Sequence, residues 1–361
     1  MKLLKPILAT AVSVIIVISS VAAASPILRE DSLHGVSQCI AMYEQPANSI
    51  DVLMLGSSHV HYGINTAKLW NDYGIAAYDY SSAEQAMWIS YHYLIEACKT
   101  QKPKIVVLDF FSTAAFQEDH KFKYHYLADS LNGFKFSPNK MQLMKACFDG
   151  KRERWDKYFP AFFGYHDRYD SLTESDFYDA SYDYTNFKGF TPYFEQDYAE
   201  KTYISTDEQK APQDKAVTYL KKLIDYTKDN GIQLYITMPP YQLNAMQTMD
   251  AVQEEDKYYN WLEAYISSLQ EQGYDNLYFD YIFKHLDDLG MDYEGGTDFY
   301  DEGHLNYYGS CKFTDYLATQ LRNIYGEDLT PDHRGDEYYS SWDKHVEEIK
   351  QKVSENGYEW R

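Results

Sequence analysis

The chain has 361 residues, of which 45% are hydrophobic and 24% are charged. These fractions exclude a mainly disordered, a collagen-like and a polytopic membrane protein. The formal net charge of −22 repels phosphate backbones, so we expect no nucleic-acid partner. Tyrosine is unusually abundant, with 37 residues, and its ring with a polar tip suits solvent-facing binding surfaces.

The N-terminal residues predict export from the cell. Lys2 and Lys5 precede an uncharged, mostly apolar run of 18 residues, from Ile7 to Ala24, that ends in small residues. This pattern is typical of a signal peptide over residues 1–24, and it also has the minimum length for an uncleaved membrane anchor through residues 7–24. Both alternatives stay open. Because the basic residues stay inside the cell, we expect the rest of the chain to be secreted or anchored to the outer face of the cytoplasmic membrane.

The four cysteines carry no metal or redox signature, because no two of them form a Cys-x-x-Cys pair. They are Cys39, Cys98, Cys147 and Cys311. An exported protein can form two disulfides, but the sequence favours isolated buried thiols over any particular pairing.

Apolar runs and helical periodicities alternate along most of the chain. Short apolar runs near glycine or proline predict strands at 49–55, 76–80, 105–108, 232–238 and 277–279. Apolar residues at helical spacing predict helices over 87–98, 216–224, 261–269 and 307–324. Strands separated by helices are typical of a parallel, doubly wound α/β sheet, and we expect about five strands in a flavodoxin-like order.

Two segments do not follow this alternation. Residues 111–210 contain 25 aromatic residues, which is too aromatic for a flexible linker. We expect them to form a cap or subdomain inserted into an α/β domain over 25–325, either as a substrate surface or as a structural excursion. Residues 326–361 contain a charged helix over 341–354 and are expected to form a peripheral C-terminal tail.

Two short motifs carry residues with catalytic chemistry. The first, Gly56-Ser57-Ser58-His59-Val60-His61, directly follows the first predicted strand, where a hydroxyl and free backbone N–H groups are exposed. The second, Asp301-Glu302-Gly303-His304-Leu305-Asn306, directly precedes the last predicted helix. An aspartate three residues before a histidine can accept from Nδ1–H, which leaves Nε2 free to take a proton from a hydroxyl. Asn306 is well placed to cap the last helix.

Together the motifs resemble those of the SGNH (GDSL-type) hydrolase superfamily. That superfamily has a Gly-x-Ser block after its first strand and an Asp-x-x-His block before its last helix, and the chain has no Gly-x-Ser-x-Gly elbow. The resemblance covers residues 50–110 and 211–325. It implies that Ser58 is the nucleophile, His304 the general base and Asp301 the residue that orients the histidine. The Gly-Ser-Ser-His sequence and the N-terminal segment resemble the membrane-anchored branch, which acts on cell-surface polysaccharides and teichoic acids, often beside a membrane-bound O-acyltransferase.

The chain departs from the superfamily pattern in two blocks. The glycine that usually lines the oxyanion hole is replaced by the stretch from Asp79 to Gln85, so backbone N–H groups, those of Ser58 and Glu84, are the oxyanion candidates. The Gly-x-Asn-Asp block is missing after the strand that ends at Asp109. Loss of one such donor typically costs about 10²–10³ in rate.

His59 and His61 also invite a metal interpretation, because paired histidines after a strand begin the binuclear site of amidohydrolase barrels. The other histidines do not have the spacing that such a site needs, so we expect neither metal nor cofactor. We expect the side chains lining the pocket to include Ser57, His59, His61, Gln85 and Asn306.

The sequence therefore predicts an exported serine esterase or O-acyltransferase that forms an acyl-serine intermediate. The expected substrate is an acylated glycan or a teichoic-acid-like polymer. The alternative is a non-catalytic, glycan-binding accessory protein on the same scaffold. The sequence leaves open the acyl group, the acceptor, and whether hydrolysis or transfer takes place.

Overall fold

The computed structural model describes residues 4–28, 35–111, 130–148, 183–196, 206–241, 249–292, 296–301 and 303–361. In this part of the chain, five strands form one all-parallel sheet in the order β2-β1-β3-β4-β5. The predicted α/β class and flavodoxin-like order are thereby confirmed. In chain order the strands are β1 (Val52–Gly56), β2 (Ala77–Ser81), β3 (Ile105–Asp109), β4 (Gln233–Thr237) and β5 (Leu277–Phe279).

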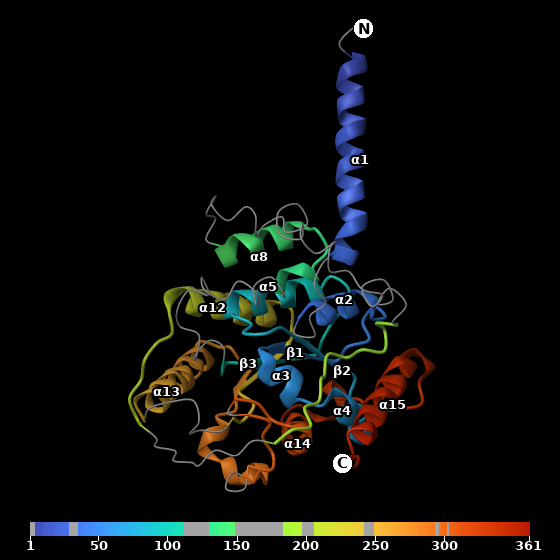
Figure 1. Ribbon diagram of the computed structural model, residues 1–361. Helices are drawn as coiled ribbons and strands as arrows, with labels where there is room; N and C mark the ends of the chain where they lie inside the picture. The colour runs from blue at the N-terminus through green and yellow to red at the C-terminus, as the bar shows by residue number, and fades with distance from the viewer. Residues whose placement is uncertain are drawn as a thin grey trace.

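Helices cover both faces of the sheet (Figure 1). One face carries α5 (Met87–Ala97) and α12 (Asp214–Asp229), with α8 (Pro138–Phe148) packed on α5 and α2 (Val36–Glu44) packed on β2. The other face carries α4 (Thr66–Tyr73) and α14 (Tyr307–Leu329), while α13 (Met249–Glu271) packs along β5. A six-residue helix, α3 (Ser58–Gly63), follows β1 directly. Short 3₁₀ turns lie at Ile282–Lys284, Leu286–Leu289 and Glu337–Tyr339.

The first strand is the point where the winding of the sheet reverses. β1 pairs with β2 on one side and with β3 on the other, with Gly56 opposite Ser81 and Leu55 opposite Leu108. The loops that follow these three strands therefore meet at the carboxyl edge of the sheet. In open α/β sheets this switch point is where ligands bind.

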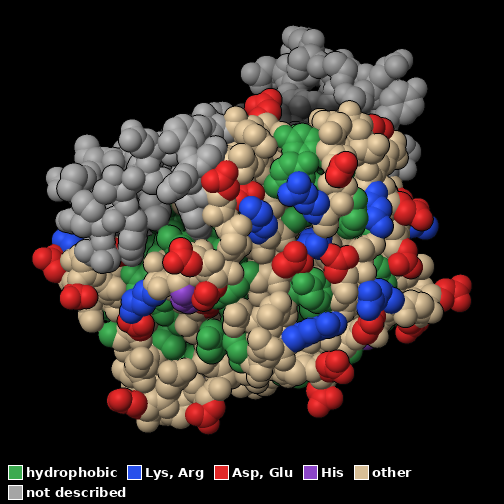
Figure 2. Space-filling view, turned by 90° about the horizontal axis from the view of Figure 1, so that it is seen from below, with side chains coloured by type: hydrophobic (Ala, Val, Ile, Leu, Met, Phe, Trp, Pro, Cys, Tyr) green, Lys and Arg blue, Asp and Glu red, His purple; other side chains and the backbone are tan. Residues whose placement is uncertain are grey.

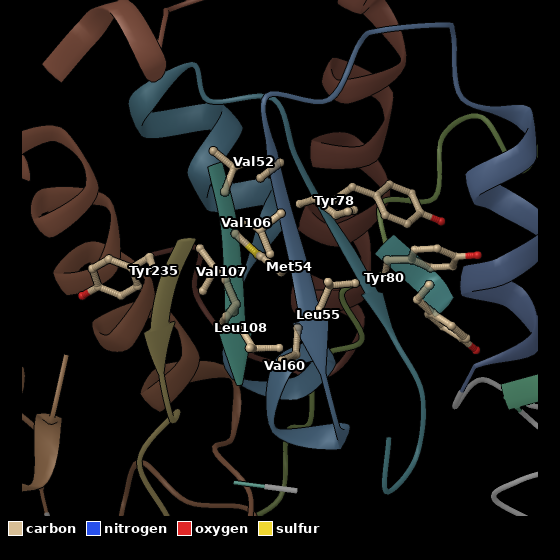
Figure 3. Packing of buried hydrophobic residues seen from close by; sticks show 14 of the residues in the cluster. Val52, Met54, Leu55, Val60, Tyr78, Tyr80, Val106, Val107, Leu108 and Tyr235 are labelled. Carbon is tan, nitrogen blue, oxygen red and sulfur yellow. The ribbon is translucent and has the colours of Figure 1, made fainter. Parts of the chain in front are cut away.

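The core combines aliphatic residues in the central strands with tyrosines in the flanking strands. Figure 3 shows Val52 and Met54 of β1 beside Val106 of β3, with the rings of Tyr78 and Tyr235 projecting to either side. The Tyr78 hydroxyl donates to the Gln38 carbonyl at 2.7 Å, and the Tyr235 hydroxyl donates to Asp280 at 2.5 Å. Because these hydroxyls find partners inside, many tyrosines of this chain are core residues, a role that composition did not predict.

The C-terminal tail is packed into the molecule at one edge of the sheet. Helix α15 (Ser340–Glu355), close to the predicted 341–354, lies against α4. Trp342 is fully buried, and its Nε1–H donates to the Ala77 carbonyl at 3.2 Å. The tail was expected to be peripheral from its charge, but its apolar side contributes to the core.

Lys188 ties this tail to a described part of the 111–210 segment. Its buried ammonium donates to Gln45 Oε1 at 2.6 Å and to Ser341 Oγ at 2.9 Å, and it lies 3.7 Å from the centre of a Trp342 ring. Burial lowers the pKa of Lys188 well below its usual range. Most of the 111–210 segment lies outside the described residues, so its prediction as a cap or subdomain stays a prediction.

Helix α1 (Leu4–Leu28) extends away from the α/β body in Figure 1. Its described apolar side chains are exposed, with Ile7 at 66% and Ile15 at 62%. A search of the described residues found no helix with both the length and the apolar character of a membrane span. The export signal stays a prediction.

The face in Figure 2, seen from below relative to Figure 1, carries acidic and basic side chains interspersed with hydrophobic ones.

All four cysteines are free thiols, and Cys39 and Cys311 are buried. Burial raises the pKa of the Cys311 thiol to about 11, which makes it a poor nucleophile.

Candidate active site

The two predicted motifs meet at the carboxyl edge of the sheet. Ser58 Oγ lies 2.7 Å from His304 Nε2, although the two residues are 246 positions apart in the chain. His304 Nδ1 lies 2.8 Å and 3.0 Å from the two carboxylate oxygens of Asp301. The His304 side chain is 23% exposed and that of Asp301 is 37% exposed, so a substrate can reach the group from solvent.

The turn after β1 presents Ser58. Gly56 ends the strand, and a Cβ there would lie 2.3 Å from Asp109 Cβ and 2.6 Å from Val60 Cγ2, so only glycine fits. Ser57 is the N-cap of α3, and its hydroxyl accepts from the His59 N–H at 3.3 Å. Ser58 is the first residue of the helix, where a backbone N–H has no partner within the helix and is available to an oxyanion.

The loop before α14 holds Asp301 and His304 in place. Asp301 Oδ1 accepts from the N–H groups of Gly303 and His304, both at 2.8 Å. Asn306 caps α14 as predicted, because its side-chain oxygen accepts from Tyr308 N–H at 3.0 Å and Gly309 N–H at 3.1 Å. Asn306 therefore supports the loop from the helix side.

The charge of this site follows from the same contacts. Burial raises the pKa of Asp301, but the hydrogen bond and the electrostatic attraction of His304 and the backbone donors lower it more, so the net shift is downward. An ionised Asp301 keeps the proton of His304 on Nδ1. The Nε2 lone pair then faces the Ser58 hydroxyl, which is the arrangement of an activated nucleophile.

A buried carboxylate that sequence reasoning missed supports the turn. Asp109, at the end of β3, is 2% exposed, and its Oδ2 accepts from Ser57 N–H at 3.1 Å and from Ser57 Oγ–H at 2.8 Å. Its Oδ1 accepts from Phe111 N–H at 2.8 Å. Burial raises the pKa of Asp109 to about 6, against the lowering effect of these bonds.

His59 also supports the turn that carries Ser58. Its Nδ1 lies 3.0 Å from Ser57 Oγ, and its ring packs 3.9 Å from that of Phe111 and 5.1 Å from that of His304. Burial and the charge of His304 lower the pKa of His59 well below its usual range, so the ring stays neutral. His59 therefore lies directly beside the histidine of the candidate triad.

Two other predicted pocket residues, His61 and Gln85, form hydrogen bonds with serines outside the triad. His61 Nδ1 pairs with Ser81 Oγ at 3.0 Å. Gln85 accepts from Ser82 Oγ at 3.0 Å and donates to Ser90 Oγ at 3.1 Å. Glu84, the second oxyanion candidate, has a left-handed backbone with a φ of 47°. In the described chain no group of three or more His, Cys, Asp or Glu is arranged to hold a metal ion.

Three stacked tyrosines form a wall beside His304. The rings of Tyr62 and Tyr193 lie 3.9 Å apart, those of Tyr193 and Tyr300 lie 3.7 Å apart, and both pairs are stacked. The edge-on contact of Tyr62 with His304, at 5.3 Å, joins the stack to the triad. Tyr193 lies in the aromatic segment 111–210, so that segment reaches the site.

The residues missed by sequence reasoning share one feature. Asp109 and the tyrosines come from separate parts of the chain, and only the strand order and the return of residues 183–196 bring them to Ser58 and His304. The one signal in the sequence that could have identified Asp109 was its place at the end of the strand that pairs with β1.

Comparison of the chain with family models, with curated proteins and with solved structures found no match.

Proposed function

We propose that the protein is an exported serine esterase or O-acyltransferase that acts on acylated cell-surface glycans through an acyl-Ser58 intermediate. One observation carries the proposal: the hydrogen-bonded line from Ser58 Oγ through His304 to the Asp301 carboxylate. The resemblance of the two motifs to the SGNH superfamily gives further support, and it suggests a membrane-bound O-acyltransferase as a partner.

In the proposed reaction, Ser58 Oγ attacks the carbonyl carbon of an ester, and its proton passes to His304 Nε2. Asp301 stabilises the imidazolium that forms, and the N–H groups of Ser58 and Glu84 bind the oxyanion. When the C–O bond breaks, His304 gives the proton to the leaving alcohol and the acyl group stays on Ser58. Water or a sugar hydroxyl then attacks the acyl carbon, again losing its proton to His304. As the bond to Ser58 Oγ breaks, His304 returns this proton to Ser58 Oγ, and an acid or a new ester is released.

The tyrosine stack supports a carbohydrate substrate. Tyr62 is only 2% exposed and Tyr193 is stacked between Tyr62 and Tyr300, so the outer face of Tyr300 is the one in this stack that could receive a sugar ring. A ring held there would bring its ester or hydroxyl substituents close to Ser58 and His304.

The test is labelling by a fluorophosphonate probe together with hydrolysis of p-nitrophenyl acetate. Wild type should be labelled on Ser58 and should turn over the ester, and Ser58→Ala should do neither. Ser267→Ala, which removes an exposed hydroxyl from α13, is the matched control and should behave as wild type.

Two outcomes would overturn the proposal. Ester turnover by Ser58→Ala equal to that of wild type would remove Ser58 from the reaction. A folded wild type that binds acylated glycan, but shows neither labelling nor turnover, would favour the glycan-binding accessory protein. Product analysis with and without a soluble glycan acceptor would separate hydrolysis from transfer.

A further inference from the structure

We propose that Asp109 is a positioning residue for the nucleophile, which it holds through Ser57 and His59 as one hydrogen-bonded relay beneath the triad. The inference rests on the proposed function, because it assigns Asp109 a role in the reaction of Ser58. The relay is distinct from the triad, since none of its three members is Ser58, Asp301 or His304.

The relay joins two strands and both loops of the site. Asp109 at the end of β3 holds Ser57 by two hydrogen bonds, at 2.8 Å and 3.1 Å, and Ser57 Oγ continues to His59 Nδ1 at 3.0 Å. All three residues are at most 5% exposed. Because Ser58 lies between Ser57 and His59 in the chain, fixing its two neighbours fixes the backbone that carries its Oγ.

The relay has one proton arrangement for each state of Asp109. With Asp109 ionised, the Ser57 hydroxyl donates to Oδ2 and accepts from His59 Nδ1–H, so that His59 Nε2 carries a lone pair. When Asp109 takes one proton from solvent, Oδ2–H donates to Ser57 Oγ, and the Ser57 hydroxyl turns to donate to Nδ1. The His59 proton must then move to Nε2, and the ring stays neutral in both states.

The groups that face the relay determine the pH at which this change of protonation occurs. Ser57 and the Phe111 N–H contact the Asp109 carboxylate, and among the residues that the structure describes no charged group contributes to its pKa of about 6. His59 faces Ser57, the ring of Phe111, the edge of Tyr241 at 5.9 Å, and His304, and the Gly303 backbone raises its pKa. Above about pH 6 the relay therefore holds the arrangement with Asp109 ionised.

The relay, which keeps the His59 ring neutral in both of its states, matters because His304 becomes positively charged during the reaction. A neutral His59 ring, fixed against Phe111 at 3.9 Å, keeps a second positive charge away from the imidazolium 5.1 Å away. Without Asp109, the turn could rotate and move Ser58 Oγ from His304. A misplacement of about 1 Å costs about 10²-fold in rate.

The first experiment measures the rate of fluorophosphonate labelling of the full chain from pH 4.5 to 9. Asp109→Asn should slow labelling at pH 8 by about 10–100-fold. Asp280→Asn is the matched control, because Asp280 is also a buried carboxylate directly after a strand, bonded to Tyr235 on β4, and it should label at the wild-type rate. On the acid side, protonation of Asp109 should contribute to the fall in the wild-type rate, and Asp109→Asn should lack that contribution.

The second experiment reads the tautomer of His59 by ¹⁵N NMR of histidine-labelled protein, with His59→Gln for assignment. Wild type at pH 8 should show the proton on Nδ1. Asp109→Asn and Ser57→Ala should lose that preference, and Ser57→Thr, which keeps the hydroxyl, should restore it. This readout separates positioning from a purely structural contribution of Asp109 to stability.

The two experiments separate the relay from the proposed function. A wild type that is never labelled refutes the proposed chemistry, and the tautomer measurement then judges the relay alone. An unchanged His59 tautomer in Asp109→Asn overturns the relay. Equal labelling rates in Asp109→Asn and Asp280→Asn overturn its role in positioning Ser58.

Discussion

Asp79 should make the stability of the protein fall as pH rises. It is the central residue of β2, is fully buried, and neither carboxylate oxygen has a hydrogen-bond partner among the described residues. The return of the chain at Gly189 covers it so closely that a Cβ there would lie 2.6 Å from Asp79 Cβ. Burial alone raises the pKa of Asp79 well above its usual value of 3.8.

The sign and the size of the effect follow from one proton. The folded protein keeps the Asp79 proton over a pH range in which the unfolded chain has lost it, so rising pH favours unfolding until the folded pKa is passed. Each pH unit in that range should lower the free energy of unfolding by about 1.4 kcal/mol. Asp79→Asn has nearly the same shape and no proton to lose, so its stability should lack this contribution.

The assay is urea unfolding followed by tryptophan fluorescence at pH 5, 6 and 7. The stability of Asp79→Asn relative to wild type should rise with pH, by about 1.4 kcal/mol per unit wherever the folded protein holds the proton and the unfolded chain does not. Asp229→Asn, an exposed substitution on α12, controls for the loss of a carboxylate in general. A difference between wild type and Asp79→Asn that is the same at all three pH values would refute the reasoning.

Three further predictions concern the triad, the tail and the N-terminus. Asp301→Asn should lower kcat for p-nitrophenyl acetate by about 10⁴-fold with little change in KM, because His304 loses the partner that sets its tautomer; a loss below tenfold would contradict this role. Trp342→Ala should lower the free energy of unfolding in urea by about 3–5 kcal/mol, because it removes a fully buried ring between α15 and β2; a cost below about 0.5 kcal/mol, the usual size of a surface effect, would count against it. Cell fractionation should find the protein in membranes or outside the cell, as Lys2, Lys5 and the apolar run predict, and a mainly cytoplasmic pool would speak against export.

The elements with a simple apolar pattern were the ones that the sequence predicted well. Each of the five strands was placed within a few residues, because a buried parallel strand is an uninterrupted apolar run. Helix α13 begins at Met249 rather than near Trp261, because its first turns are rich in acidic residues and show no apolar periodicity. Helical propensity and packing therefore extend α13 beyond the residues whose apolar spacing predicts a helix.

The same distinction applies to the candidate site, where some residues could be predicted from the sequence and others could not. Ser58, Asp301 and His304 could be predicted because each lies in a short motif whose order and spacing express one chemistry. Asp109 could not, because a single aspartate at a strand end has no spacing, and its partner Ser57 is 52 residues away. Its role depends on β3 pairing with β1, which is a property of the strand order.

The buried Lys188 has a consequence for how this protein can change during evolution. Lys188 bonds to Gln45 near α2 and to Ser341 at the start of α15, and five residues later the same segment delivers Tyr193 to the triad. The Tyr193 carbonyl accepts from Tyr307 N–H at 2.6 Å, and the Tyr307 hydroxyl in turn accepts from the N–H of Arg361, the last residue. Selection for a new substrate therefore acts on residues far from the triad in the sequence, and substitutions at Gln45 and Ser341 should covary with those at Lys188.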